Sequence, residues 1–171
     1  MRLNAQYNGS SFFDLLRIEH PHLLPDETVW SQAAVGSIPH GTTVLAMKCA
    51  DGVLVAGDRL ATAGHSVASR DVVKVFATDT YSCMAISGAA GPAIEMARVL
   101  SVELEHYEKI EGQALELEGK ANKLSQMLRQ NLPAAMQGLA VVPLFAGFDS
   151  RRKTGRLWKF DITGGRYEET E

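Results

Sequence analysis

The order of the predicted elements constrains the fold of this chain most: strand-like segments come first, two helices follow, and strand-like segments return. Apolar residues recur at helical spacing from Ala93 to Tyr107 and again from Ala121 to Ala135, with charged residues on the opposite sides. Pro133 is expected to end or kink the second helix. Two consecutive amphipathic helices that pack as a layer on strands predict an α+β layered fold.

The strands are predicted from short apolar runs bounded by turn-forming residues. Residues 43–47 and 53–57 flank the pair Asp51-Gly52, which predicts a hairpin. Two further runs before the helices are expected to extend the same antiparallel sheet. These runs are residues 72–76 and 81–87, and the strands expected after the helices are 139–147 and 157–162, the last followed by a turn into 166–167.

Residues 1–41 differ in character from the rest, with three prolines and the turn-forming run Asn8-Gly9-Ser10. They are predicted to be a leader or arm. Within it, Ser10-Ser11 is expected to cap a short apolar helix that ends at the pair His20-Pro21.

Composition excludes several classes of protein. A chain of 171 residues fits one domain, and a net charge of −3 gives no basic surface to attract nucleic acid. We find no signal peptide and no apolar run long enough to span a bilayer, so a cytoplasmic protein without membrane contact is expected. The two cysteines, Cys49 and Cys83, form no CxxC pair. They are predicted to be buried reduced thiols, with no metal and no cofactor.

The motifs that could carry chemistry lie in the first half of the chain. No serine-protease elbow, Walker loop, HExxH or GxGxxG is present. Read singly, Gly41-Thr42-Thr43 is an ordinary strand start, Asp58 a turn former and Lys74 a solvent-facing lysine. Read in order, these residues and Ser87-Gly88 resemble the β-subunits of the bacterial proteasome.

The resemblance runs from about Ser10 to Glu171 and is greatest to the actinobacterial type. It implies an Ntn-hydrolase fold, an αββα sandwich of antiparallel sheets flanked by helices. It also implies a propeptide, residues 1–41, that the chain itself removes by cutting between Gly41 and Thr42. The segments that carry the resemblance are His40-Gly41-Thr42-Thr43, Ala56-Gly57-Asp58-Arg59, residues 103–109, residues 138–144 and residues 164–169.

The catalytic residues implied by the resemblance are Thr42, Asp58, Lys74 and Gly88. Once freed, the α-amino group of Thr42 has an intrinsic pKa of about 8, so it can act as general base for its own hydroxyl. Lys74 would lower the proton affinity of this amine, with Asp58 orienting the lysine. The backbone N–H of Gly88 would form the oxyanion hole, where one donor contributes about 3 kcal/mol.

The resemblance also implies a substrate site for extended polypeptides. The backbones of Thr62 and Ala90 would pair with the substrate as an added strand. The first specificity pocket is expected to be apolar throughout, which predicts cleavage after large hydrophobic residues. Its implied members are Ala61, Val72, Phe76, Ile86, Ala90 and Ile94.

The partners implied by the resemblance are identical β-subunits in seven-membered rings, rings of α-subunits and a ring ATPase that unfolds substrates. Chains of this family normally continue beyond a point like Glu171 with residues that orient the threonine, so this sequence is expected to be a fragment. Two alternatives stay open. One is a two-ring threonine protease that works without α-subunits, and the other is a non-catalytic ring subunit.

Overall fold

Two small hairpins open the part of the chain that the computed structural model describes, which is residues 42–63 and 66–170. Strands β1 (Val44–Cys49) and β2 (Gly52–Gly57) pair antiparallel, as the Asp51-Gly52 turn predicts. Strands β3 (Ala61–Ala63) and β4 (Ser66–Ser69) form the second hairpin. This second hairpin was not predicted from the sequence, because its residues are mostly small or polar and form no apolar run.

The main sheet has five antiparallel strands in the order β5-β6-β7-β8-β9. Its first two strands precede the helices and its last three follow them, so segments far apart in sequence pair at the centre of the sheet. The strands are β5 (Val75–Asp79), β6 (Ser82–Ala85), β7 (Leu144–Asp149), β8 (Thr154–Phe160) and β9 (Arg166–Glu169).

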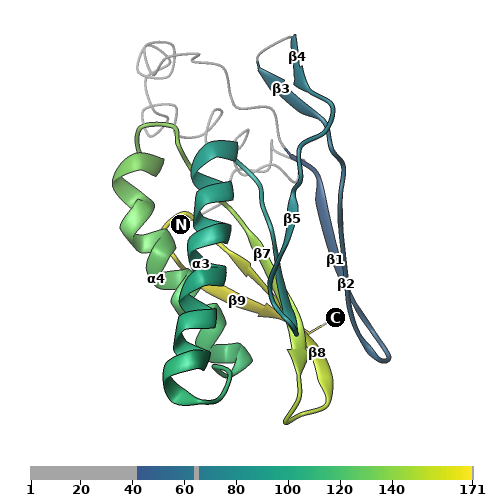
Figure 1. Cartoon of the computed structure of the whole chain (residues 1–171). Coiled ribbons are helices and arrows are strands. Elements are labelled where there is room, and N and C mark those ends of the chain that lie inside the picture. Colours follow the sequence, from purple (N-terminus) through teal and green to yellow (C-terminus); the bar gives the residue numbers. More distant parts are fainter. Residues whose placement is uncertain (1–41, 64–65, 171) are drawn as a thin grey trace, which may run out of the picture. The chain divides into compact units, whose positions relative to one another are not determined.

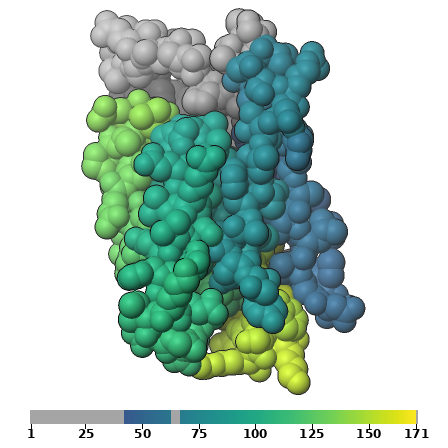
Figure 2. All heavy atoms as spheres, in the orientation of Figure 1, coloured from purple at the N-terminus to yellow at the C-terminus, as the bar shows by residue number. Residues whose placement is uncertain are grey.

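The described elements form three layers (Figure 1). Helices α3 (Ala90–Glu111) and α4 (Leu117–Ala135) lie side by side (Figure 2). They cover one face of the five-stranded sheet, with α3 against β5 and α4 against β7 and β9. The β1–β2 hairpin packs on β7 and β8 from the other face. The α+β prediction is therefore confirmed at the level of antiparallel sheets with two helices.

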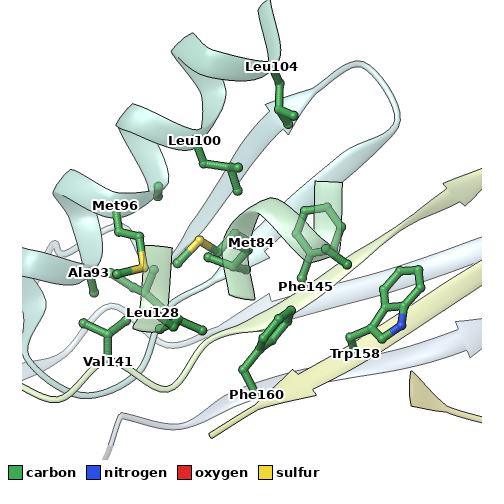
Figure 3. Packing of buried hydrophobic residues seen from close by; sticks show 14 of the residues in the cluster. Met84, Ala93, Met96, Leu100, Leu104, Leu128, Val141, Phe145, Trp158 and Phe160 are labelled. Carbon is green, nitrogen blue, oxygen red and sulfur yellow. The ribbon is translucent and has the colours of Figure 1, made fainter. Parts of the chain in front are cut away.

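The hydrophobic core lies between the helices and the five-stranded sheet. Leu100 of α3 and Leu124 of α4 are fully buried, and they face Phe145 and Trp158 of the central strands. The rings of Phe145 and Trp158 are tilted, with centroids 6.0 Å apart, in the range of favourable aromatic contacts (Figure 3). This cluster anchors the central strands to both helices.

One expectation about the sheets was wrong. The β1–β2 hairpin is a separate two-stranded sheet and does not join β5 and β6. Alternate residues of β1 are exposed, so Leu45 and Met47 face outward while Val44 and Ala46 are half-buried. The apolar pattern predicted the strands correctly, but it does not specify which strands become neighbours.

Details of the helices and cysteines refine the other expectations. Helix α3 is capped by Gly112, whose φ of 69° is left-handed, and Pro133 lies inside the last turn of α4, just before the helix ends. Cys49 is exposed and Cys83 half-buried, so the prediction of buried thiols was wrong for Cys49, which lies on the outward face of β1.

No described helix is long and apolar enough to cross a membrane. The short helix expected from Ser10 to Ile18 lies outside the described residues.

Candidate active site

Lys74 is a buried cation at the entrance to β5. Its side chain is 5% exposed, and its Nζ donates to Asp58 Oδ1 and to the carbonyl oxygen of Leu60, both at 2.7 Å. It lies one residue before the strand in which the sequence placed it. An ammonium group has three N–H donors, so these two bonds leave a third for another acceptor in the site.

Asp58 holds one side of this cation. Its other carboxylate oxygen, Oδ2, accepts the N–H of Leu60 at 2.9 Å. The hydrogen bond from Lys74 and this backbone bond lower the pKa of the Asp58 carboxyl below its ordinary value. The side chain is 47% exposed, so Asp58 is an ionised, solvated anchor for a lysine that is itself buried.

The backbone explains why residues distant in sequence meet here. Val44 pairs with Gly57, and continuing this antiparallel register brings Thr42 beside the segment that contains Asp58. Across the sheet, the N–H of Ile86 donates to the carbonyl oxygen of Lys74 at 2.8 Å, which extends the β5–β6 ladder by one residue. The ladder therefore brings Lys74 close to the segment that leads into Gly88.

Gly88 occupies a position that excludes side chains. Its φ is 96°, and an added Cβ would lie 2.2 Å from the carbonyl oxygen of Ala140. Gly88 and Val141 form an antiparallel bridge, in which the flanking residues make the hydrogen bonds. The N–H of Ala89 donates to the Ala140 carbonyl at 2.8 Å, and the N–H of Val142 donates to the Ser87 carbonyl at 3.0 Å. In such a pair the N–H of the central residue points away from the partner strand, so that of Gly88 is directed outward.

A small cavity of about 30 Å³ connects these groups. Thr42, Lys74 and Gly88 all line it, and Asp58 reaches it through its bond to Lys74. Four of the six predicted pocket residues line the same cavity, namely Ala61, Val72, Ile86 and Ala90. The structure therefore brings the predicted catalytic residues and most of the predicted pocket into one place.

The other predicted site residues lie differently. Phe76 and Ile94 pack against the hydrophobic core and are not among the residues that line the cavity. Thr62 is exposed on β3, next to a register shift between Ala61 and Thr62. Gly41 lies outside the described residues.

Sequence reasoning missed three participants. Ser87 and Ala93 line the cavity, and the Leu60 carbonyl binds Lys74. Ala93 follows Ala90 by three residues on α3, so helical spacing could have indicated it. A backbone acceptor leaves no such signal in the side-chain pattern. Among the residues that the structure describes, no group of three or more His, Cys, Asp or Glu side chains could hold a metal ion.

Comparison with known proteins shows the family to which the chain belongs. The sequence model of the family described as proteasome subunit matches residues 38–170, so the chain belongs to the proteasome subunit family. Within that family it is similar to β-subunits.

The similar proteins are actinobacterial proteasome β-subunits. Identity to "Proteasome subunit beta" of Acidimicrobium ferrooxidans is 61% over 132 residues, which cover 77% of this chain and 48% of the relative. The protein of the same description from Acidothermus cellulolyticus is 52% identical over 94% of this chain and 57% of its own length. The one from Streptomyces griseus is 53% identical over 95% and 58%. The chain thus spans about half the length of the relatives it matches, and its predicted resemblance to this family is confirmed.

Proposed function

We propose that this chain forms the catalytic part of an N-terminal threonine endopeptidase of the proteasome. The observation that supports it best is the single cavity lined by Thr42, by the buried Lys74 and by Gly88, whose backbone conformation and close packing exclude a side chain. A hydroxyl, a held cation and an outward-directed backbone N–H are the groups that acyl transfer requires. A subunit with a purely structural role needs none of them in one place.

In the proposed reaction, Thr42 Oγ1 attacks the carbonyl carbon of the peptide bond. The freed α-amino group of Thr42 takes the hydroxyl proton and passes it to the leaving amine, which leaves an ester on Thr42. The α-amino group of Thr42 then activates a water molecule, which hydrolyses the ester and restores the Thr42 hydroxyl. The N–H of Gly88 donates to the oxyanion in both halves of the reaction.

Lys74 supplies the positive charge that this cycle needs. A cation beside the α-amino group disfavours the protonated amine, so more of the amine is free to act as base near neutral pH. Asp58 and the Leu60 carbonyl fix the ammonium group from one side, 2.7 Å from each acceptor. Because the Lys74 side chain is buried, its field is less weakened by water than that of a surface lysine.

We further propose a preference for cleavage after hydrophobic residues, with an extended substrate paired to the backbones of Thr62 and Ala90. The apolar side chains of Ala61, Val72, Ile86 and Ala90 support this, since a charged side chain would lose hydration there without gaining a partner. Phe76 and Ile94 do not line the cavity and would act indirectly, by packing against the hydrophobic core next to it.

The wider assembly follows from the family and is also proposed. Residues 1–41 would be a propeptide removed by the chain itself, and residues 42–171 part of an αββα Ntn-hydrolase domain. The subunit would work in the cytoplasm within seven-membered β-rings, flanked by α-rings and supplied with unfolded polypeptides by a ring ATPase. The relatives' description as proteasome β-subunits supports this arrangement.

The N-terminus of the β-chain tests the proposal. The complete reading frame that contains residues 1–171 would be expressed with an α-type subunit, and the intact mass and first residue of the β-chain determined. We expect a first residue of Thr42 in the wild type, and an uncut chain without peptidase activity in Thr42→Ala. The matched control is Thr43→Ala, which changes the exposed neighbour and should be cut normally. Cutting in Thr42→Ala would contradict the proposal.

A further inference from the structure

An exposed ion pair lies beside the candidate site and has no part in the reaction proposed above. The guanidinium of Arg59 donates through Nη1 to Asp71 Oδ1, and the two side chains are 63% and 77% exposed. The partners are 12 residues apart in sequence, on either side of the β3–β4 hairpin. The pair therefore joins the two ends of the segment that carries this hairpin.

The same two ends build the site. The carbonyl oxygen of Arg59 accepts the N–H of Val72, the residue after Asp71, at 3.0 Å. Both acceptors of Lys74 flank Arg59 directly, since they are the carboxylate of Asp58 and the carbonyl of Leu60. The ion pair thus spans the point at which the chain segment 58–60 crosses the segment 71–74.

The cavity wall continues from this crossing point. Ala61 follows Leu60 and Val72 follows Asp71, and both line the cavity. The β3–β4 ladder between them has a register shift between Ala61 and Thr62, and such a shift locally disrupts the ladder at the base of the hairpin. Contacts at the base of the hairpin therefore matter for the spacing of the wall.

We propose that Arg59 and Asp71 are positioning residues, whose ion pair fixes segment 58–62 against segment 71–74. It thereby holds the two acceptors of Lys74 in place and sets the distance between Ala61 and Val72. The structural part of this inference stands on the contacts above, and its catalytic consequence rests on the proposed function.

The exposure of the pair shapes the expected effect. Solvent-exposed ion pairs contribute little to the stability of a fold, and salt screens them. A guanidinium and a carboxylate are nevertheless directional partners, so they can select one geometry of two segments that are already folded. Loss of the pair should therefore lower kcat by a small factor, without unfolding the protein.

Charge exchange tests this directly. Arg59→Asp, Asp71→Arg and the double exchange would be made in the complete reading frame, co-expressed with an α-type subunit. We expect each single variant to lower kcat for a fluorogenic peptide about threefold at low salt, the size typical of one exposed pair, and the double exchange to restore it. The deficit of the single variants should shrink in high salt, where exposed pairs are screened. The matched control is the pair Arg151 and Glu116, also exposed and distant in sequence, whose exchange should leave kcat unchanged.

Hydrogen exchange of the Val72 amide gives a readout that does not depend on activity. We expect faster exchange in both single variants, wild-type exchange in the double exchange, and no change in the Arg151 and Glu116 control. Unchanged exchange at Val72 in all variants would overturn the proposal, as would single variants whose kcat loss the double exchange fails to rescue. If the wild type cleaves no peptide while Val72 exchange responds as expected, the proposed function fails and the positioning contact stands.

Discussion

The helix-covered face of the five-stranded sheet and the two small hairpins differ in how they are held together. On the helix face, large apolar side chains such as Trp158, Phe145 and Leu124 are fully buried. In the β1–β2 hairpin, the β3–β4 hairpin and the link between them, several large apolar side chains remain exposed, and hydrogen bonds and ion pairs join the segments around Lys74. These exposed residues are Leu45, Met47, Leu54, Leu60 and Val67. The packed core and the candidate site therefore lie largely in different regions, which meet at Ile86 and Ala93.

The difference has a physical reason. Burial and close packing stabilise a core, and they leave no room in it for a substrate. A catalytic group must stay hydrogen-bonded yet reachable, as Lys74 does between a solvated carboxylate and a cavity. Variants in the two regions should accordingly separate loss of activity from loss of stability.

The largest expected effect is on activity, from Lys74→Met. Methionine keeps an apolar stem of similar length but removes the cation, so we expect peptidase activity to fall by about 100-fold to 1,000-fold. The Asp58 carboxylate left behind is half-exposed and stays hydrated, so the urea midpoint of unfolding should barely change. Lys109→Met on the exposed side of α3 is the control, with wild-type values for both. A large drop in the midpoint for Lys74→Met would show that the lysine is chiefly structural.

The converse prediction concerns the packed region. Leu124→Ala on α4 removes a fully buried side chain, and we expect the free energy of unfolding to fall by about 2–5 kcal/mol. Activity per correctly folded molecule should persist, because α4 contributes no residue to the cavity. Denaturant unfolding and active-site titration measure the two quantities. Val102→Ala, 64% exposed on α3, should change stability by about 0.5 kcal/mol or less.

Gly88→Ala is expected to lower both stability and activity, because the Gly88 backbone lies close to the Ala140 carbonyl and also lines the cavity. The left-handed backbone and the approach to the Ala140 carbonyl should cost about 1–3 kcal/mol of stability, and the displaced N–H should also lower activity. Gly91→Ala is the matched control, since an added Cβ there meets nothing within 4 Å in the first turn of α3. We expect it to be stabilising by about 0.4–1 kcal/mol. Equal stability of the two variants would contradict this assignment.

The same contrast shows what the sequence could and could not predict. Helical periodicity gave both helices, and alternation gave most strands, because each pattern follows from burial of one face. Lys74 and Gly88 were identified through motifs, but their proximity depends on the Ile86 to Lys74 backbone bond. Neither that bond nor the Leu60 carbonyl that holds Lys74 has a side-chain signature. The separation of β1–β2 from β5–β6 was likewise unpredictable, since strand patterns do not specify neighbours.

The smallest expected effect is on the pH dependence of stability, and it lies in the turn between β8 and β9. Asp161 Oδ1 accepts the hydroxyl and N–H of Thr163 and the N–H of Gly165, and its Oδ2 accepts the Tyr167 hydroxyl. These bonds, that of the Thr163 hydroxyl foremost, lower the pKa of Asp161 to about 2. An unfolded aspartate has a pKa of about 3.9, so the folded state binds the proton less tightly than the unfolded state.

The sign of the effect follows. The stabilisation from Asp161 is fully present above the unfolded pKa and is lost as the pH falls toward about 2. Because Asp161 is only partly buried, solvent weakens the effect. Asp161→Asn removes the charge, so its urea midpoint should fall less than that of the wild type between neutral and acidic pH. Tyr167→Phe, which removes one donor, should give an intermediate slope. Parallel slopes for all three proteins would mean that this turn does not depend on the ionised carboxylate, and that the acid sensitivity of the sheet originates elsewhere, as in the carboxylates around Arg156.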